Sequence, residues 1–208
     1  MNHWSFGGHS VRGLLYNECC TERKAPAVNG ILIQQHIGGS AFFNRSWDEF
    51  KVGFGNTSDS YWVGNDRLHQ LTKDGRYRLR VDLLSKFNGL WYWAEYDSFS
   101  VGSELTDYTL FVSHYTGNAG DGMNVDGITG YNLNGAKFQT YDRYFISRCM
   151  DTTRNIGGFW YTGSGIYTCG HAVVNRQSPY FAWKSLPIGT RGRDHVALLQ
   201  SRMTLVEK

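Results

Sequence analysis

The spacing of apolar residues predicts a short strand followed by a short helix near the start of the chain. The run Ile31-Leu32-Ile33 is typical of a buried strand. Ser46 and Glu49 have the spacing of a capping box, in which each residue satisfies a free N–H group at the start of a helix. We therefore expect a helix that begins at Ser46, buries its aromatic residues and ends near Gly53 or Gly55.

A second helix and a sheet are expected next. The helix fits residues 66–73, with Asn65 as its N-cap and Gly75 beyond its end. Apolar and charged residues then alternate with the two-residue period of a half-buried strand, and Asn88-Gly89 is a strong turn signal. We expect an antiparallel meander with both helices packed against it, and a last strand near the C-terminus. The strands of the meander span residues 77–84, 91–96 and 108–114.

From residue 117 to residue 195 the periodic pattern is lost. This part is rich in Gly, Asn, Asp, Thr and Tyr and has few apolar runs. Disorder is one interpretation, but the number of large aromatic residues argues against it. We expect an ordered half built from loops, where binding sites tend to lie. The aromatic residues in question are Phe138, Tyr141, Phe145, Phe159, Trp160 and Trp183.

The composition fits a compact domain that contains a sheet. The chain has 208 residues, enough for one large domain or two small ones. Aromatic residues reach 15%, with 25 glycines and 3 prolines, which favours many tight turns over a helical bundle. No apolar run approaches the ~20 residues that span a bilayer. The net charge of +3 is dispersed, so we expect no nucleic-acid partner.

Catalytic and metal-binding motifs are missing from the sequence. It has no G-x-S-x-G elbow, no glycine-rich phosphate loop, and no histidine with a sequence partner for acid–base chemistry. We therefore expect a protein that is not an enzyme and carries no cofactor. The four cysteines form no C-x-x-C pair, which argues against structural zinc; instead we expect a disulfide between Cys149 and Cys169. N-x-S sequons at Asn44 and Asn56 favour a secreted glycoprotein.

Several longer motifs together indicate a known family. The chain resembles the fibrinogen-related domain of fibrinogen chains, ficolins, tachylectins, angiopoietins and tenascins, over about residues 30–208. The motifs that carry the resemblance are residues 43–55 (FNRSWDEFKVGFG), 61–66 (YWVGND), 77–83 (YRLRVDL), 94–99 (AEYDSF), 138–142 (FQTYD) and 157–161 (GGFWY).

The resemblance implies an α+β fold: a central antiparallel β-sheet flanked by two short helices, with a loop-rich C-terminal subdomain that binds ligands. Residues 30–208 would form this globular domain, after an irregular segment, residues 1–29, that is shortened relative to the family. The family's first N-terminal cysteine has no counterpart here. Cys19 and Cys20 are therefore expected to be free thiols or to join another chain.

The resemblance also implies where a ligand would bind. In lectin-like members, acetyl groups enter a small aromatic pocket around the second disulfide. The histidine that follows the second cysteine in the family stands one place later here, and extra residues precede that cysteine. A simpler interpretation is that these aromatic residues only fill the core. The expected pocket residues are Asp151, Thr152, Thr153, Cys169, Gly170, His171, Tyr180 and Phe181.

Calcium is expected to be missing from the family's usual position. Members that bind the ion carry an acidic run after the F-x-T-x-D motif, since Ca²⁺ takes six to eight oxygen ligands. Here that stretch is shortened, keeps only Asp142, and adds Arg143 and Arg148. Asp142 is therefore the remaining calcium candidate at this position.

The leading hypothesis is a secreted, extracellular recognition domain of lectin type, oligomeric in the full-length protein. It would bind acetylated sugars or other microbial surface groups in innate defence. One alternative is a receptor- or matrix-binding ligand domain, as in angiopoietin-like and tenascin-like members. Another is a structural role in extracellular assemblies. Neither a membrane nor a nucleic acid is expected as a partner.

Overall fold

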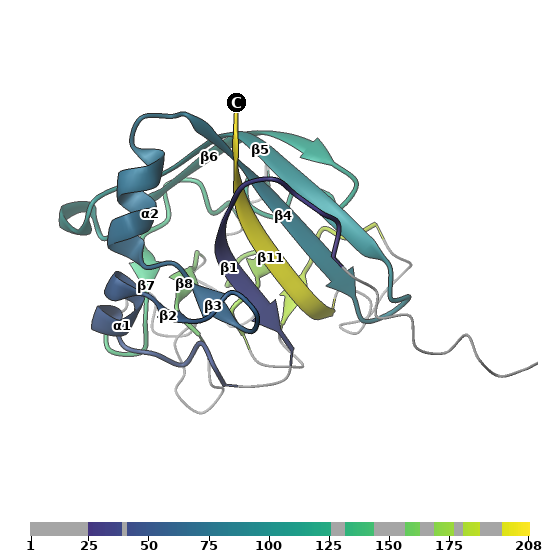
Figure 1. Ribbon diagram of the computed structural model, residues 1–208, viewed down its shortest axis with the longest axis horizontal. Helices are drawn as coiled ribbons and strands as arrows, with labels where there is room; N and C mark the ends of the chain where they lie inside the picture. The colour runs from purple at the N-terminus through teal and green to yellow at the C-terminus, as the bar shows by residue number, and fades with distance from the viewer. Residues whose placement is uncertain are drawn as a thin grey trace, which may run out of the picture.

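The computed structural model describes residues 25–38, 41–125, 132–143, 157–162, 169–176, 181–187 and 197–208 (Figure 1). No helix in these ranges is long and apolar enough to cross a membrane. In chain order the elements are β1 (Ile31–Ile37), α1 (Trp47–Val52), β2 (Phe54–Gly55), β3 (Tyr61–Trp62), α2 (Asn65–Thr72), β4 (Tyr77–Ser85), β5 (Trp91–Val101), the 3-10 helix η1 (Glu104–Thr106), β6 (Leu110–Gly117), β7 (Phe138–Gln139), β8 (Phe159–Trp160), β9 (Ala172–Val173), β10 (Ala182–Trp183) and β11 (Leu198–Glu207).

A seven-stranded antiparallel sheet with the order β2-β3-β1-β11-β4-β5-β6 organises the fold. The predicted meander is confirmed as β4, β5 and β6, which are neighbours in the chain and in the sheet. The last strand, β11, lies between β1 and β4 (Figure 1), so the sheet is complete only when the end of the chain is in place. The predicted α+β class, with a sheet and two short helices, is confirmed.

β6 begins later than the apolar pattern predicts. Asp107 and Tyr108 have φ angles of 54° and 48°, a left-handed conformation that a strand does not use. Tyr108 is nevertheless fully buried, and its hydroxyl donates a hydrogen bond to Asp66 in α2 (2.6 Å). Tyr108 therefore belongs to the core between the sheet and the helices, and the strand itself starts at Leu110.

Helix α1 begins as the capping box predicts. The Ser46 side chain accepts a hydrogen bond from the Glu49 amide (3.3 Å), and the Glu49 carboxylate accepts one from the Ser46 amide (2.9 Å). Trp47 and Phe50 are buried, and Gly53 ends the helix with a φ of 94°. Local sequence thus determines both ends of this helix.

Helix α2 starts at Asn65, so the prediction of Asn65 as its N-cap is wrong. The cap position is Gly64, which has a φ of 97° and provides no side-chain hydrogen bond. The Asn65 side chain is buried and accepts a hydrogen bond from the Trp62 indole N–H (3.1 Å). A buried indole N–H needs an acceptor, and this need takes precedence over the capping preference of asparagine.

A bulge in β1 brings polar side chains into the interior. The pairing of β1 with β11 shifts between Leu32 and Gln34, and a bulge changes which residues face inward. Ile33 and Gln34 are both fully buried, as is His36. β1 is therefore longer than the predicted run 31–33, and its second half places an amide and an imidazole against the C-terminal loops.

Aromatic side chains join the loop-built half of the chain to the rest of the molecule, as expected. Phe138 and Trp160 pack with ring centroids 5.1 Å apart, and they lie 5.7 and 6.1 Å from Trp62. The Trp160 indole also donates to the Tyr108 carbonyl (2.7 Å). Two small antiparallel pairs, β7–β8 and β9–β10, provide the regular structure in the described stretches of this half. Tyr141, by contrast, is 39% exposed.

Candidate ligand-binding site

Half of the residues predicted for the ligand pocket lie in the described part of the chain. These are Cys169, Gly170, His171 and Phe181. The others are outside the described residues, and their part in a pocket stays a prediction. They are Asp151, Thr152, Thr153 and Tyr180.

Cys169 is disulfide-bonded and buried, with 7% of its surface exposed. Cys149, Cys19 and Cys20 lie outside the described residues. The pairing of Cys169 with Cys149 therefore stays a prediction, and so does the state of the two N-terminal cysteines.

The backbone turns sharply at Gly170, directly after the disulfide. This glycine has a φ of 101°, and a Cβ placed on it would lie 2.7 Å from a methyl carbon of Leu133. Both the conformation and the close approach require glycine. The turn leads through His171 into β9, which pairs with β10 so that Val173 lies opposite Ala182. Residues 169–171 lead into β9 and Phe181 leads into β10, so they adjoin the two strands of one hairpin.

His171 is held in a fixed orientation at the start of this hairpin. Its Nδ1 lies 3.2 Å from the Ser185 hydroxyl, which donates its own proton to the Asp121 carbonyl (2.6 Å). Nδ1 must therefore carry the hydrogen of the neutral ring and donate it to Ser185. Burial and the nearby Lys184 ammonium lower the pKa of His171. The half-buried ring is accordingly neutral at physiological pH.

The charges around His171 are positive. Burial, together with Arg176, lowers the pKa of Lys184 to about 8. Arg176 is itself buried, with 8% of its surface exposed. Such an environment favours ligand oxygen atoms over ligand cations. The candidate site therefore combines a neutral imidazole with the neighbouring Lys184 ammonium at the start of the hairpin.

Phe181 lies behind this surface rather than on it. Its side chain is 1% exposed and stacks on the His36 ring, with centroids 4.2 Å apart and an interplanar angle of 26°. Phe181 is therefore a core residue in this structure, and its part in a ligand pocket stays a prediction. Its role is to support the hairpin from the core side.

Asp142, the calcium candidate, stabilises helix α1. Its carboxylate accepts a hydrogen bond from the Trp47 amide at the first turn (3.0 Å) and one from the Thr140 hydroxyl (2.7 Å). The neighbouring Arg143 pairs with Asp107 (2.5 Å) and lies 4.0 Å over the Trp47 ring. Within the described ranges no group of three or more His, Cys, Asp or Glu residues could hold a metal ion.

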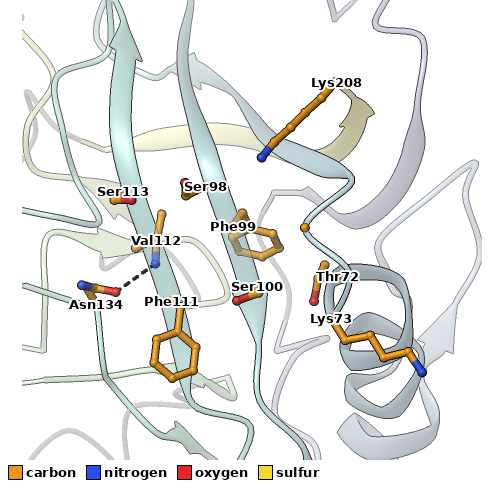
Figure 2. Close-up of a pocket in the computed structure, with 11 residues that line it drawn as sticks. Thr72, Lys73, Ser98, Phe99, Ser100, Phe111, Val112, Ser113, Asn134 and Lys208 are labelled. Carbon is orange, nitrogen blue, oxygen red and sulfur yellow. Dashed lines mark hydrogen bonds between the residues drawn. The ribbon is translucent and has the colours of Figure 1, made fainter.

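Sequence reasoning missed a groove beside the sheet edge. It has a volume of about 350 Å³ and lies between the end of α2 and strands β5 and β6 (Figure 2). Phe111, on the edge strand β6, is 52% exposed there, and Asn134 accepts a hydrogen bond from the Val112 amide (2.9 Å). The available signal was an aromatic residue at an outward position between two buried ones. The lining residues are Thr72, Lys73, Gly75, Ser98, Phe99, Ser100, Phe111, Val112, Ser113, Asn134 and Lys208.

Comparison with known proteins gives consistent matches. Residues 19–186 match the family described as "Fibrinogen beta and gamma chains, C-terminal globular domain". Fibrinogen-like protein A of Apostichopus parvimensis is 33% identical over 166 residues, which cover 75% of this chain and 54% of that protein. Fibroleukin of Bos taurus is 41% identical over 149 residues, covering 69% and 31%. The fibrinogen-like globe domain of human ANGPTL6 superposes with a TM-score of 0.67 at 28% identity, covering 85% of this chain and 77% of that one.

The chain belongs to the family of fibrinogen C-terminal globular domains. Members of this family are non-enzymatic binding domains. The chain spans 54% of Fibrinogen-like protein A and 31% of fibroleukin, so it corresponds to one part of each of these relatives.

Proposed function

We propose that this chain is the recognition domain of a secreted, extracellular protein and binds acetylated sugars or related microbial surface groups. The observation that carries this proposal is the geometry at His171. A neutral imidazole, oriented by Ser185, follows a disulfide-bonded cysteine across a glycine turn and is half-exposed on a hairpin with a buried aromatic support. A small ligand pocket needs such fixed polar groups beside apolar walls.

The chemistry expected is that of an acetyl group. Its methyl group needs an apolar wall, for which Tyr180 is the candidate, and its carbonyl oxygen needs a donor. The amides of Cys169 and Gly170 are candidate donors, and the basic groups near His171 favour an oxygen atom there. We expect binding to be independent of calcium, because the carboxylate at the usual position already accepts hydrogen bonds from α1 and Thr140.

Retention on N-acetylglucosamine resin tests the proposal. Removal of the Tyr180 ring takes away ~50 Å² of apolar wall, worth about 1 to 1.5 kcal/mol, so Tyr180→Ala should weaken each site roughly tenfold. His171→Ala should weaken binding at each site by a similar factor. Phe111→Ala serves as the control, because Phe111 lies far in the sequence from the hairpin. If Tyr180→Ala and His171→Ala were retained as well as the Phe111→Ala control and the wild type, this site would be contradicted. Loss of retention on addition of a chelator would contradict the calcium-independent interpretation.

The groove at β6 favours a second candidate function, binding to a protein receptor or matrix partner. An exposed phenylalanine beside hydroxyl groups and an amide is a surface suited to a peptide segment. If this function holds, Phe111→Ala should lower affinity for a protein partner at least tenfold, while His171→Ala should leave it unchanged. Measuring both Phe111→Ala and His171→Ala for resin retention and for affinity to a protein partner therefore distinguishes the two functions.

A further inference from the structure

His36 occupies an apolar site between the sheet and the C-terminal loops. The side chain lies on β1 and is fully buried. Its ring stacks on Phe181 (4.2 Å) and meets the Phe43 ring edge-on (5.0 Å, 63°). Its Nδ1 lies 2.9 Å from the carbonyl of Val174, next to β9. His36 therefore links β1 to the β9–β10 hairpin.

The hydrogen bond determines which nitrogen of His36 carries the proton. A carbonyl oxygen only accepts, so Nδ1 donates to Val174 and Nε2 holds the lone pair. Nε2 is buried and has no hydrogen-bond partner in the described part of the chain. Protonation would place a second N–H group and a positive charge at this nitrogen. A buried, unpaired charge is costly, so protonation favours a state in which the ring is exposed to water.

Within the described ranges, no hydrogen bond or ion pair joins the His36 ring to an acidic group. β1 carries no other charged side chain. Glu49, near Phe43 in the sequence, is already paired with Arg45 (2.9 Å). Arg202 belongs to the opposite face of β11, since its neighbour Ser201 is the residue that contacts Gln34. The charged residues nearest in sequence to the ring contacts are all cations: Arg45, Arg176, Lys184 and Arg202.

The same boundary is otherwise held by a small amide network. Gln34 donates to Asn175 (3.0 Å) and to Ser201 (2.9 Å), and Asn175 donates to the Gly158 carbonyl (2.8 Å). The groups in these bonds do not titrate between pH 5 and pH 8. The His36 ring does, and its protonation affects both its hydrogen bond and its stacking contact. His36 is thus the pH-sensitive member of this group of contacts.

We propose that His36 is an acid-sensitive contact: protonation of its ring detaches the β9–β10 hairpin from β1, while the long strands of the sheet stay paired. Burial lowers the pKa of His36, with the Val174 carbonyl opposing the shift. Because the folded pKa lies below the value of about 6.5 for a free ring, stability is constant above pH 6.5 and falls below it. Each pH unit below that value should favour the detached state by up to tenfold, until the folded pKa is reached. This inference does not depend on which ligand the domain binds.

Hydrogen exchange between pH 7.5 and 5.5, corrected for the intrinsic rate, tests the proposal on the disulfide-intact protein. Because the pKa of His171 at the start of the same hairpin is also lowered, proteins with and without His36→Gln are compared in a His171→Gln background. Protection of peptides from residues 170–185 should fall about tenfold from pH 6.5 to 5.5 in His171→Gln and stay constant in the His36→Gln/His171→Gln double variant. Peptides from β4 and β5 should keep their protection in both proteins. His114→Gln, which replaces an exposed histidine, should leave the behaviour of His171→Gln unchanged when it is added to that background.

Two results would overturn the proposal. One is equal pH dependence in His171→Gln and the double variant, and the other is a parallel loss of protection in β4 and β5. If the double variant does not fold, NMR titration of the His36 ring in the wild type decides, since a pKa at or above 6.5 excludes the mechanism.

Discussion

Replacement of Asp142 distinguishes a structural carboxylate from a metal ligand. Asp142→Ala removes the acceptor of the Trp47 amide and of the Thr140 hydroxyl. Loss of an N-terminal helix acceptor costs ~1 kcal/mol, and loss of a negative charge at that end of the helix costs ~0.3–1 kcal/mol more. We therefore expect Asp142→Ala to lower the free energy of unfolding by about 1.5 kcal/mol, or Tm by roughly 3 to 6 °C. Asp142→Asn, which keeps an acceptor oxygen, should cost less than half of this.

The assay is thermal unfolding of each variant in calcium chloride and in a chelator. Asp48→Ala is the matched control, because Asp48 is an exposed acid in the first turn of the same helix. It removes a charge from that helix end, so it should lower Tm by only about 1 to 3 °C, less than Asp142→Ala. For the wild type we expect the same Tm with calcium and with chelator. A rise in Tm with calcium that disappears in Asp142→Asn would refute this reasoning, since a ligand that binds only the folded state stabilises it.

Two further predictions concern the turn at the site and the sequons. Gly170→Ala should destabilise the domain by ~2 to 3 kcal/mol in urea unfolding, because it adds a clash with Leu133 to a left-handed φ; Gly135→Ala, at a similar φ of 83° with open space around it, should cost only ~1 kcal/mol. Equal losses of unfolding free energy in Gly170→Ala and Gly135→Ala would exclude the clash with Leu133 as a cause. In protein secreted from eukaryotic cells, Asn44→Gln and Asn56→Gln should each remove one glycan, since both side chains are exposed. The turn at Asn56 uses only its oxygen, which leaves the amide nitrogen for the sugar. Unchanged mass in both variants would contradict this.

Local chemistry predicted the elements whose ends depend on local groups. The Ser46–Glu49 capping box forms as its spacing indicates. The meander follows from the two-residue period of β4 and the Asn88-Gly89 turn. One local prediction failed on a tertiary requirement, and one long-range contact was not predicted. Asn65 does not cap α2 because the buried Trp62 indole, three residues earlier, uses its side-chain oxygen. The contact of Asp142 with the Trp47 amide joins residues that are 95 positions apart, which no local pattern indicates.

At the candidate site, too, local sequence does not predict which side chains are exposed. His171 directly precedes β9 and Phe181 directly precedes β10, yet the first is half-buried and the second is 1% exposed. The difference arises in β1, where the bulge between Leu32 and Gln34 turns His36 inward and gives Phe181 a stacking partner. No pattern within residues 169–181 contains that information. The sequence can therefore indicate which stretch is a candidate site, but which of its side chains is exposed depends on a strand more than a hundred residues away.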